Sequence, residues 1–445
     1  MRVMFFKIPN AFDSHCHFLA TGQVASGLSL KNLKSAHDIK NLKIEAHHFQ
    51  NQWLVGFGWD QNEWEDPSFP FKKTLDDVFS THPVFFSRAD GHASWINTMA
   101  IAELKKLGYD FVADPIGGKI SKDSNGEPSG LLFDQAHIKA LSLLPSYSPE
   151  QIKNFIFKAQ KIFNSGGFTH VRDLSMTWHL WQILSEMVIK KELSVCIESF
   201  VTVENLNDLD RVFQEIQMMK NNPSSQLRIK GVKLFLDGSL GSKTAYISKN
   251  YLDSNTNTNS NGLLAWNLND IKKIIQQTWQ NGLELAVHTI GDEAAHQVVL
   301  QAREISATGL LGRLHLEHVQ ILRPETIQLM KPLHLVCHMQ PCHWLTDHKW
   351  LSKVLPSELL KDSFPWEALR RNKIPIQFGS DSPIEPTSLI VNRLALVQSA
   401  TLGVPEFKSD WMMCHQHSDL TWTNSWTEFT DEKILQVYFE GKPLI

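Results

Sequence analysis

The strongest constraint on the fold is a repeated succession of a short apolar segment and a helical segment. The short segments are rich in β-branched or aromatic residues and are bounded by turn-forming residues, which is typical of buried strands. They lie at residues 12–18, 168–174, 194–201, 231–237, 284–290, 313–319, 334–340 and 374–381. Helical patterns separate them, for example at 149–165, 267–281 and 292–306. This α/β order predicts a (β/α)8 TIM-like barrel rather than an open doubly wound sheet, because no glycine-rich GxGxxG turn accompanies it.

The barrel is expected to span residues 10–400, with a long insertion after its first strand at about 23–150. Loops that follow the strands surround the active site of such a barrel, so the insertion is expected to form a lid or a pocket wall. The tail at 414–445 contains two or three strand-like segments and a hairpin turn at Glu440-Gly441. It is expected to form a small β element apart from the barrel.

The composition favours a soluble globular protein. Of the 445 residues, 42% are hydrophobic and 20% are charged, and the formal net charge is −4. No block of like charges predicts binding to nucleic acid or to a membrane surface, and no apolar run reaches the roughly 18 residues of a membrane helix. The five cysteines are scattered and form no CxxC pair, which indicates reduced thiols and a cytoplasmic location. The expected partner is a small-molecule substrate, and the sequence leaves room for a homo-oligomer.

Residues that bind metal ions recur near the ends of the predicted strands. His15 and His17 share one side of the first strand because side chains alternate, and Cys16 takes the other side. His288, His318 and Asp381 lie near the ends of later strands, where a parallel barrel gathers its functional groups. Nitrogen and oxygen ligands suit zinc, with manganese, iron, cobalt or nickel as alternatives. The pattern therefore predicts a metal site.

Some choices within these strands stay open. His315 and His318 face opposite sides of their strand, and the position of His318 nearer the end favours it. Lys230 competes with Lys233 as the functional lysine of the fourth strand, which also carries Asp237 near its end. His170 has no assigned ligand role.

At these residues the chain resembles the amidohydrolase superfamily, and more narrowly the amidohydrolase family 3 group that includes N-substituted formamide deformylases. The matching stretches run from Phe12 to Pro386 and read FDSHCHF, GWDQNEW, FFSRADGHASWIN, NGEPSGLLFDQA, VKLFLDGSLGSKTA, HTIGDEAAH, HLEHVQ, QPCHWLTD and FGSDSPIEP. The motifs are multiple and ordered, so they are specific for the group, but they do not identify the substrate.

The resemblance implies a site with one or two divalent ions, zinc being the preferred choice. The implied metal ligands are His15, His17, Lys233, His288, His318 and Asp381. Lys233 matches a lysine that is carbamylated in binuclear members and bridges the two metals. The implied reaction is hydrolysis of a C–N bond in an amide, formamide or cyclic amide by metal-activated hydroxide. Asp381 would act as the general base, and His288 or His343 would support the oxyanion.

The same resemblance implies residues that contact the substrate. The RxDGH segment supplies Arg88, Asp90 and His92, and the QPxH segment supplies Gln340 and His343. The pocket is expected to be aromatic, lined by Trp59, Trp64 and Trp95; packing of these side chains in the core of the insertion is an equal alternative.

The chain departs from the family pattern in its small β domain. Members carry tens of residues before the first strand, whereas here that strand begins at Phe12, so the β domain is expected to be reduced to the tail. Two other functions stay open. A mononuclear deaminase would carry an HxxE arrangement, but Thr289, Ile290 and Gly291 follow His288. A non-catalytic binding relative would not need the full ligand set.

Overall fold

The computed structural model describes residues 5–252, 260–401 and 411–444. Its central sheet has eight strands in the order β16-β15-β14-β13-β12-β11-β10-β2, and every paired neighbour runs parallel. The strands are β2 (Phe12–Cys16), β10 (His170–Met176), β11 (Cys196–Thr202), β12 (Leu227–Phe235), β13 (Glu284–Thr289), β14 (Leu314–His318), β15 (Leu335–Met339) and β16 (Ile376–Phe378). The predicted barrel is confirmed, and each predicted strand is present.

The barrel closes where β16 meets β2. The backbone N–H of Asp381 donates to the carbonyl of His15 at 2.7 Å, and the N–H of His17 donates to the carbonyl of Ser382 at 2.8 Å. A Cβ atom at Gly379 would lie 2.5 Å from the backbone nitrogen of His15, so only glycine permits this approach. The closure therefore brings the first and last predicted metal ligands side by side.

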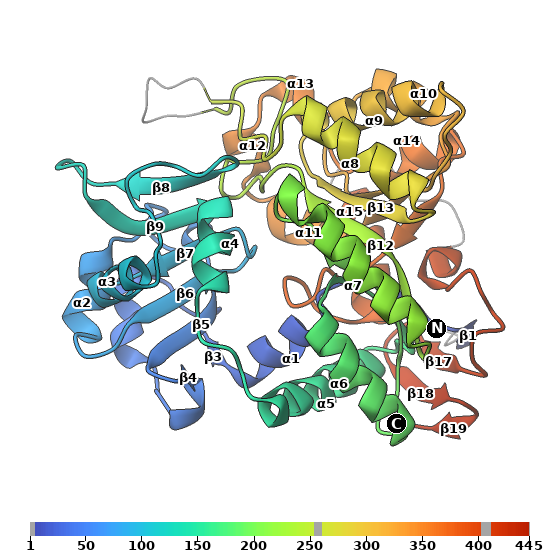
Figure 1. The fold of residues 1–445 in the computed structure, drawn as a ribbon, viewed down its shortest axis with the longest axis horizontal. Coiled ribbons are helices and arrows are strands. Elements are labelled where there is room, and N and C mark those ends of the chain that lie inside the picture. The colour runs from blue at the N-terminus through green and yellow to red at the C-terminus, as the bar shows by residue number, and fades with distance from the viewer. Residues whose placement is uncertain (1–4, 253–259, 402–410, 445) are drawn as a thin grey trace.

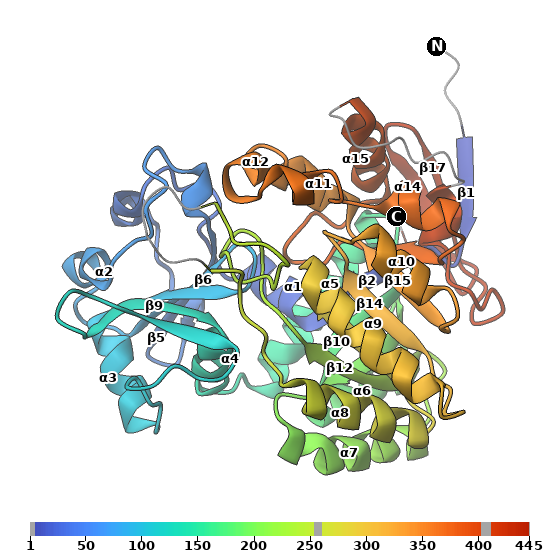
Figure 2. The same cartoon turned by 90° about the horizontal axis from the view of Figure 1, so that it is seen from above.

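Helices cover the outside of the barrel (Figures 1 and 2). On α8, Ile271, Ile274, Ile275 and Thr278 are buried, and this spacing gives the helix one apolar stripe against the strands. The side chain of Asn267 caps that helix. The helices of the barrel are α1 (Phe18–Ser26), α5 (Pro149–Ser165), α6 (Trp178–Ile189), α7 (Leu209–Asn221), α8 (Leu268–Gln280), α9 (Asp292–Ser306), α10 (Pro324–Met330), α11 (Pro341–Asp347), α12 (Leu351–Val354), α13 (Ser357–Leu360), α14 (Trp366–Arg371) and α15 (Leu389–Thr401).

The insertion folds into a second α/β unit beside the barrel (Figure 1, in blue and cyan; Figure 2). Its sheet has the order β3-β5-β6-β7-β9-β8, with β4 paired to β5. Its elements are β3 (Leu28–Ser29), β4 (Phe49–Gln50), β5 (Trp53–Trp59), α2 (Lys72–Val78), β6 (Val84–Arg88), β7 (Ala93–Ile96), α3 (Thr98–Lys106), β8 (Gly118–Lys122), β9 (Pro128–Asp134) and α4 (Gln135–Ser142). Apolar clusters lie on both faces of the sheet, so the insertion has a core of its own. Short 3-10 helices lie at Ala36–Asn41, Ala46–His48, Gln61–Glu63, Leu206–Asp208 and Trp411–His415.

The small β element is a four-stranded antiparallel sheet. Its order is β1-β17-β18-β19, with β1 (Phe5–Pro9), β17 (Trp426–Thr430), β18 (Ile434–Phe439) and β19 (Lys442–Pro443). The expectation that this element comes from the tail alone is wrong, because β1 pairs with β17 along its length and Phe6 stacks on Phe429. Within the parts of the chain that the structure describes, no helix is long and apolar enough to cross a membrane.

Candidate metal centre and pocket

The HxH pair and Asp381 meet at the closure of the barrel. Asp381 Oδ1 lies 3.1 Å from His15 Nε2 and 3.5 Å from His17 Nε2. One donor atom from each of the three residues lies within 4.8 Å of the other two. Cys16, between the histidines, is buried in the apolar core on the opposite side of the strand. The alternation of β2 therefore gathers two imidazoles and one carboxylate into a group that fits a metal ion.

Two further imidazoles adjoin this group. The ring of His318, at the end of β14, lies 4.5 Å from the ring of His15 and 4.5 Å from the ring of His288 on β13. His315 does not reach the group, because its ring is held between Glu284 and His338 at 2.7 and 2.8 Å. Strand alternation thus separates the two histidines of β14, as the sequence indicated.

The orientation of each ring shows which nitrogen is free. His15 Nδ1 donates to Glu317 at 2.7 Å, His318 Nδ1 donates to Gln340 Oε1 at 3.0 Å, and His288 Nε2 donates to the carbonyl of Gly238 at 3.1 Å. Burial lowers the pKa of His288 and His318 well below the ordinary value, so each of these rings is neutral and its other nitrogen carries a lone pair. Although burial opposes it, Asp381 and Glu317 raise the pKa of His15. The close approach of His15 Nε2 and Asp381 Oδ1 therefore favours a positive charge between them, either a proton or a metal ion.

His288 does not suit the second role predicted for it, support of an oxyanion. Its one N–H is used by the carbonyl of Gly238, and burial lowers its pKa well below the ordinary value, which keeps the ring neutral. Its Nδ1 makes no hydrogen bond with the described residues. The ring is thus oriented as a ligand rather than as a hydrogen-bond donor.

Lys233 is fully buried on β12, and its Nζ makes no hydrogen bond with any described residue. Burial lowers the pKa of this amine to about 8. Lys230 instead lies 3.5 Å from Glu198 and 3.7 Å from Glu284, away from the histidine group. Of the two lysines, only Lys233 has an amine without a carboxylate partner.

Sequence reasoning missed the residues that hold His15. Glu317 accepts from His15 through one oxygen and from Arg172 Nη1 at 2.9 Å through the other, and all three side chains are buried. Although burial opposes ionisation, the charge of Arg172 and the bond from His15 hold the pKa of Glu317 well below its usual range. The available signal was a charged residue inside each of two predicted buried strands, where an isolated charge is too costly to bury.

Asp237, near the end of the fourth barrel strand, lies 3.7 Å from His288 Nε2, but its hydrogen bonds go to the backbone. Its carboxylate accepts the backbone N–H groups of Tyr246, Ile290 and Gly291 at 2.8 to 3.0 Å. It therefore fixes the loop that follows His288. Burial raises the pKa of Asp237 to about 7.

The RxDGH segment joins the insertion to the barrel. Arg88 is only 2% exposed and pairs with Asp60 and with Asp90. Asp90 also accepts from the hydroxyl of Ser239, on the loop after β12, at 2.6 Å. A Cβ at Gly241 in that loop would lie 2.9 Å from Arg88 Nη1. The segment fixes one wall of the pocket, and the Arg88 guanidinium is already engaged by carboxylates.

His92 completes this wall. Its Nδ1 bonds Asp134 Oδ1 at 2.8 Å, and its ring lies 5.0 Å from that of His288. Although burial alone would lower the pKa of His92, the hydrogen bond and charge of Asp134 raise it above the ordinary value.

The QPxH segment contacts the histidine group from the opposite side. Gln340 accepts from His318, and Gln320 Nε2 donates to His343 Nδ1 at 3.0 Å. His343 Nε2 therefore carries the proton and lies 3.7 Å from Asp381 Oδ2. Burial lowers the pKa of His343 to about 4, so the ring is a neutral donor at pH 7.

The structure does not place Trp59 or Trp95 in the pocket, so their predicted role in substrate contact is wrong. Both are completely buried and pack with Trp64 in the core of the insertion. Their indole N–H groups donate to the backbone carbonyls of Phe86 and Phe71. Core packing therefore accounts for these side chains.

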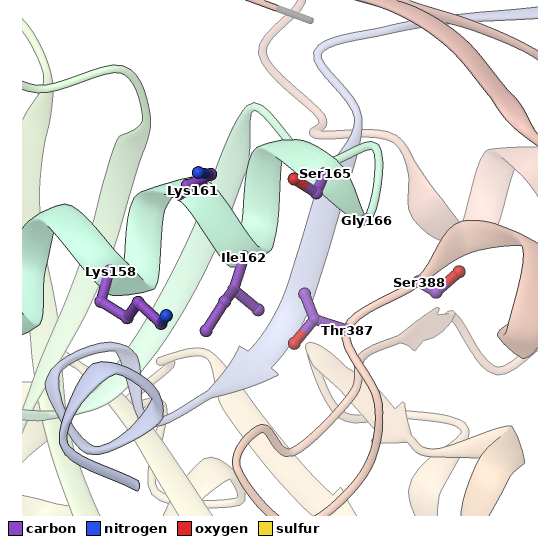
Figure 3. A pocket seen from close by; sticks show the side chains of 7 residues that line it. All are labelled: Lys158, Lys161, Ile162, Ser165, Gly166, Thr387 and Ser388. Atoms are coloured by element: carbon purple, nitrogen blue, oxygen red, sulfur yellow. The ribbon is translucent and has the colours of Figure 1, made fainter. Parts of the chain in front are cut away.

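A cavity of about 420 Å³ lies between the insertion and the barrel. Its lining includes Arg88, Asp90, His92, His288, His318, His343 and Asp381. A second hollow, of about 360 Å³, lies between the end of α5 and Thr387-Ser388 (Figure 3). That hollow is lined by Lys158, Lys161 and small residues and contains no acidic or histidine side chain. Only the first cavity adjoins the histidine group.

Glu385 in the cavity wall predicts a pH effect on stability. Burial raises its pKa from 4.5 to about 7, so the folded protein binds this proton more tightly than the unfolded chain. Stability is then lost as pH rises between these values, by about 3 kcal/mol. We expect Glu385→Gln to match the wild type near pH 4.5 and to be more stable at pH 8, measured by urea unfolding. An equal slope of stability against pH in both proteins would contradict this assignment.

A closed barrel with histidines and an aspartate at its strand ends defines a class of metal-dependent hydrolases. The chain belongs to the amidohydrolase family, whose model matches residues 8–401, and the resemblance seen in the sequence is confirmed. Family membership supports a hydrolase that uses a divalent metal.

Individual relatives agree with this assignment. The chain is 31% identical to YtcJ of Bacillus subtilis (strain 168) over 408 residues, which is 88% of this chain and 73% of the relative. It is 21% identical to the N-substituted formamide deformylase of Arthrobacter pascens over 67% of this chain and 55% of that protein. Among solved structures, an uncharacterized metal-dependent hydrolase from Pyrococcus furiosus superposes with a TM-score of 0.66 at 25% identity, covering 92% of this chain and 80% of that one.

Proposed function

We propose that this protein is a metal-dependent hydrolase that cleaves a non-peptide C–N bond in an amide, formamide or cyclic amide. The observation that carries the proposal is the close approach of His15 Nε2 and Asp381 Oδ1, at 3.1 Å, where a positive charge between the two atoms is favoured. His17, His288 and His318 lie around this pair. Its expected substrate is a small molecule, and its expected location is the cytoplasm.

The described residues fit a divalent metal. His15 Nε2, His288 Nδ1 and Lys233 Nζ are buried and make no hydrogen bond with the described residues. Imidazole nitrogens with a carboxylate suit zinc. Lys233 would act after its neutral amine attacks carbon dioxide, which forms an N–C bond, releases one proton and leaves a carbamate with two ligand oxygens. This ligand set would hold one or two ions.

A divalent metal in this set supplies Lewis acidity that makes water a nucleophile near neutral pH. Asp381 would accept the proton of the attacking water and deliver it to the leaving nitrogen. His343 Nε2, with its hydrogen directed at the cavity, would stabilise the negative charge that develops on the carbonyl oxygen. His92 and the paired Arg88 and Asp90 would orient the substrate.

The proposal is tested with protein stripped by a chelator and reloaded with zinc, manganese or cobalt in bicarbonate buffer. N-acyl amines, N-formyl amines, hydantoin-like rings, esters and amino-heterocycles are then screened for amine, acid and ammonia release. We expect C–N cleavage that is lost on chelation and restored by metal. Hydrolysis that continues at the same rate after the metal is removed by the chelator would refute the metal-dependent mechanism. Release of ammonia from amino-heterocycles, with no cleavage of the other compounds, would favour the deaminase alternative.

A further inference from the structure

We propose that the cavity selects substrates that carry a cationic group, an ammonium or guanidinium, on the side of the scissile amide nearest Asp347 and Glu385. This inference rests on the proposed function and names the substrate class for the same site. It follows from the charges of the cavity wall and from the hydrogen-bonding state of His343.

Two carboxylates in the cavity wall have no cationic partner among the described residues. Asp347, at the end of α11, contacts Gln320 Nε2 at 3.4 Å, and Glu385 accepts from the hydroxyl of Thr346 at 2.9 Å. Glu385 is only 9% exposed, and Asp347 is half-buried. Both residues line the cavity that contains Asp381. A carboxylate that is shielded from water and held only by neutral donors favours a cation that arrives with the ligand.

The arginine of the cavity does not neutralise them. Arg88 directs one guanidinium nitrogen at Asp60 and another at Asp90. Its third nitrogen donates to the side chain of Gln61 at 2.9 Å. Arg88 is therefore paired with Asp60 and Asp90, and the wall keeps more carboxyl groups than cationic groups.

The two lysines of the cavity lie at its mouth. Lys31 is exposed, and its Nζ lies 3.5 Å from the carbonyl of Pro383. The Nζ of Lys349, 58% exposed at its side chain, lies 3.9 Å from Glu63. Both lysines act to lower the pKa of Glu385, but solvent screens their exposed ammonium groups and that pKa remains raised, so neither lysine balances the carboxyl groups of the wall.

The raised pKa values of the two acids agree with this shortage of cations in the wall. Burial raises the pKa of Asp347 well above its usual range, the neighbouring charges of Glu385, Asp60 and Asp90 add to the effect, and the charge of Arg88 only partly opposes it. A bound cation would relieve this repulsion, and it would favour the ionised carboxylates.

His343 fixes the orientation of the ligand. It is 7% exposed, and its Nε2–H lies in the cavity without a hydrogen-bond partner among the described residues. A carbonyl oxygen that accepts this hydrogen places the scissile bond beside Asp381. The rest of the ligand then extends along the wall that carries Asp347, Glu385 and Trp350, whose indole face also attracts cations. A carboxylate at the same place would be repelled.

The test uses three amides of matched length on the metal-loaded protein at pH 8. They are the mono-N-acetyl derivative of diaminobutane, N-pentylacetamide, in which a methyl group replaces the ammonium, and the N-acetyl derivative of γ-aminobutyrate. We expect kcat/KM for the cationic amide to exceed that of the neutral one by at least about 10-fold, with the anionic one slowest. Equal or faster hydrolysis of the neutral amide would overturn the inference.

Two variants test whether Asp347 and Glu385 cause the preference for a cationic substrate. Asp347→Asn and Glu385→Gln are each expected to bring the cationic-to-neutral ratio close to one, whereas Glu186→Gln, at an exposed acid on α6, keeps the wild-type ratio. A ratio unchanged in both cavity variants would contradict the assignment. If no amide is hydrolysed, the proposed function fails. Calorimetric binding of the same three compounds then decides the inference, which requires the cationic amide to bind tightest.

Discussion

Replacing Asp381 by asparagine is expected to lower kcat/KM by at least about 1,000-fold while the protein stays folded. The amide of asparagine has no negative charge for a metal and cannot accept a proton from water. Oδ1 of Asp381 lies close to His15 at the end of β2 and to His17 directly after it, and Oδ2 lies 3.7 Å from His343 Nε2, so one substitution affects both the metal ligands and the proposed oxyanion donor. Asparagine also tolerates the left-handed backbone of this position, where φ is 55°.

The measurement is steady-state hydrolysis of the best amide substrate, with circular dichroism as the check on folding. Asp210→Asn, at an exposed aspartate on α7, is the matched control and should retain full activity. An Asp381→Asn protein that is folded and keeps more than a tenth of the wild-type kcat/KM would rule out Asp381 as the general base.

Replacing Glu317 by glutamine is expected to destabilise the protein by about 3 kcal/mol and to weaken metal binding. The guanidinium of Arg172 is 1% exposed at its side chain, and its close carboxylate is Glu317 at 2.9 Å; Glu198 lies farther away, at 3.9 Å. Loss of the negative charge leaves this cation buried without adequate compensation. His15 Nδ1 also loses the carboxylate that orients its ring.

Urea unfolding of metal-free protein, followed by circular dichroism, measures the stability change separately from metal binding. Glu325→Gln, at an exposed glutamate on α10, provides the control and should change the free energy of unfolding by less than about 1 kcal/mol. A similarly small change in Glu317→Gln would show that Arg172 is compensated elsewhere, and Glu198 would then be the residue to replace.

The barrel and its first ligands were predictable because they follow local periodicity. Alternation along β2 places His15 and His17 on one side, and the succession of strands and helices predicts where the later ligands lie. Glu317 and Arg172 were not predicted, since 145 residues separate them and only closure of the barrel brings them together. Sequence order alone does not show which acid faces which base across a closed sheet.

The tryptophans illustrate a different reason for failure. An indole ring suits a pocket wall and an apolar core equally well, and the choice depends on how the sheet of the insertion packs. Trp59 and Trp95 proved to lie in that core. Likewise, the pairing of β1 with β17 joins the two ends of the chain, and no periodicity within either strand specifies its partner.

The number of metal ions bound per chain is the direct test of a divalent metal centre that includes Lys233. Protein purified with bicarbonate present is analysed for its elements as wild type, as Lys233→Ala and as the control Lys230→Ala, whose lysine lies outside the histidine group. We expect one to two equivalents of divalent metal in the wild type and in the control, and a clearly lower content in Lys233→Ala. A wild-type protein that binds no metal, even after reconstitution, would refute the proposed metal centre.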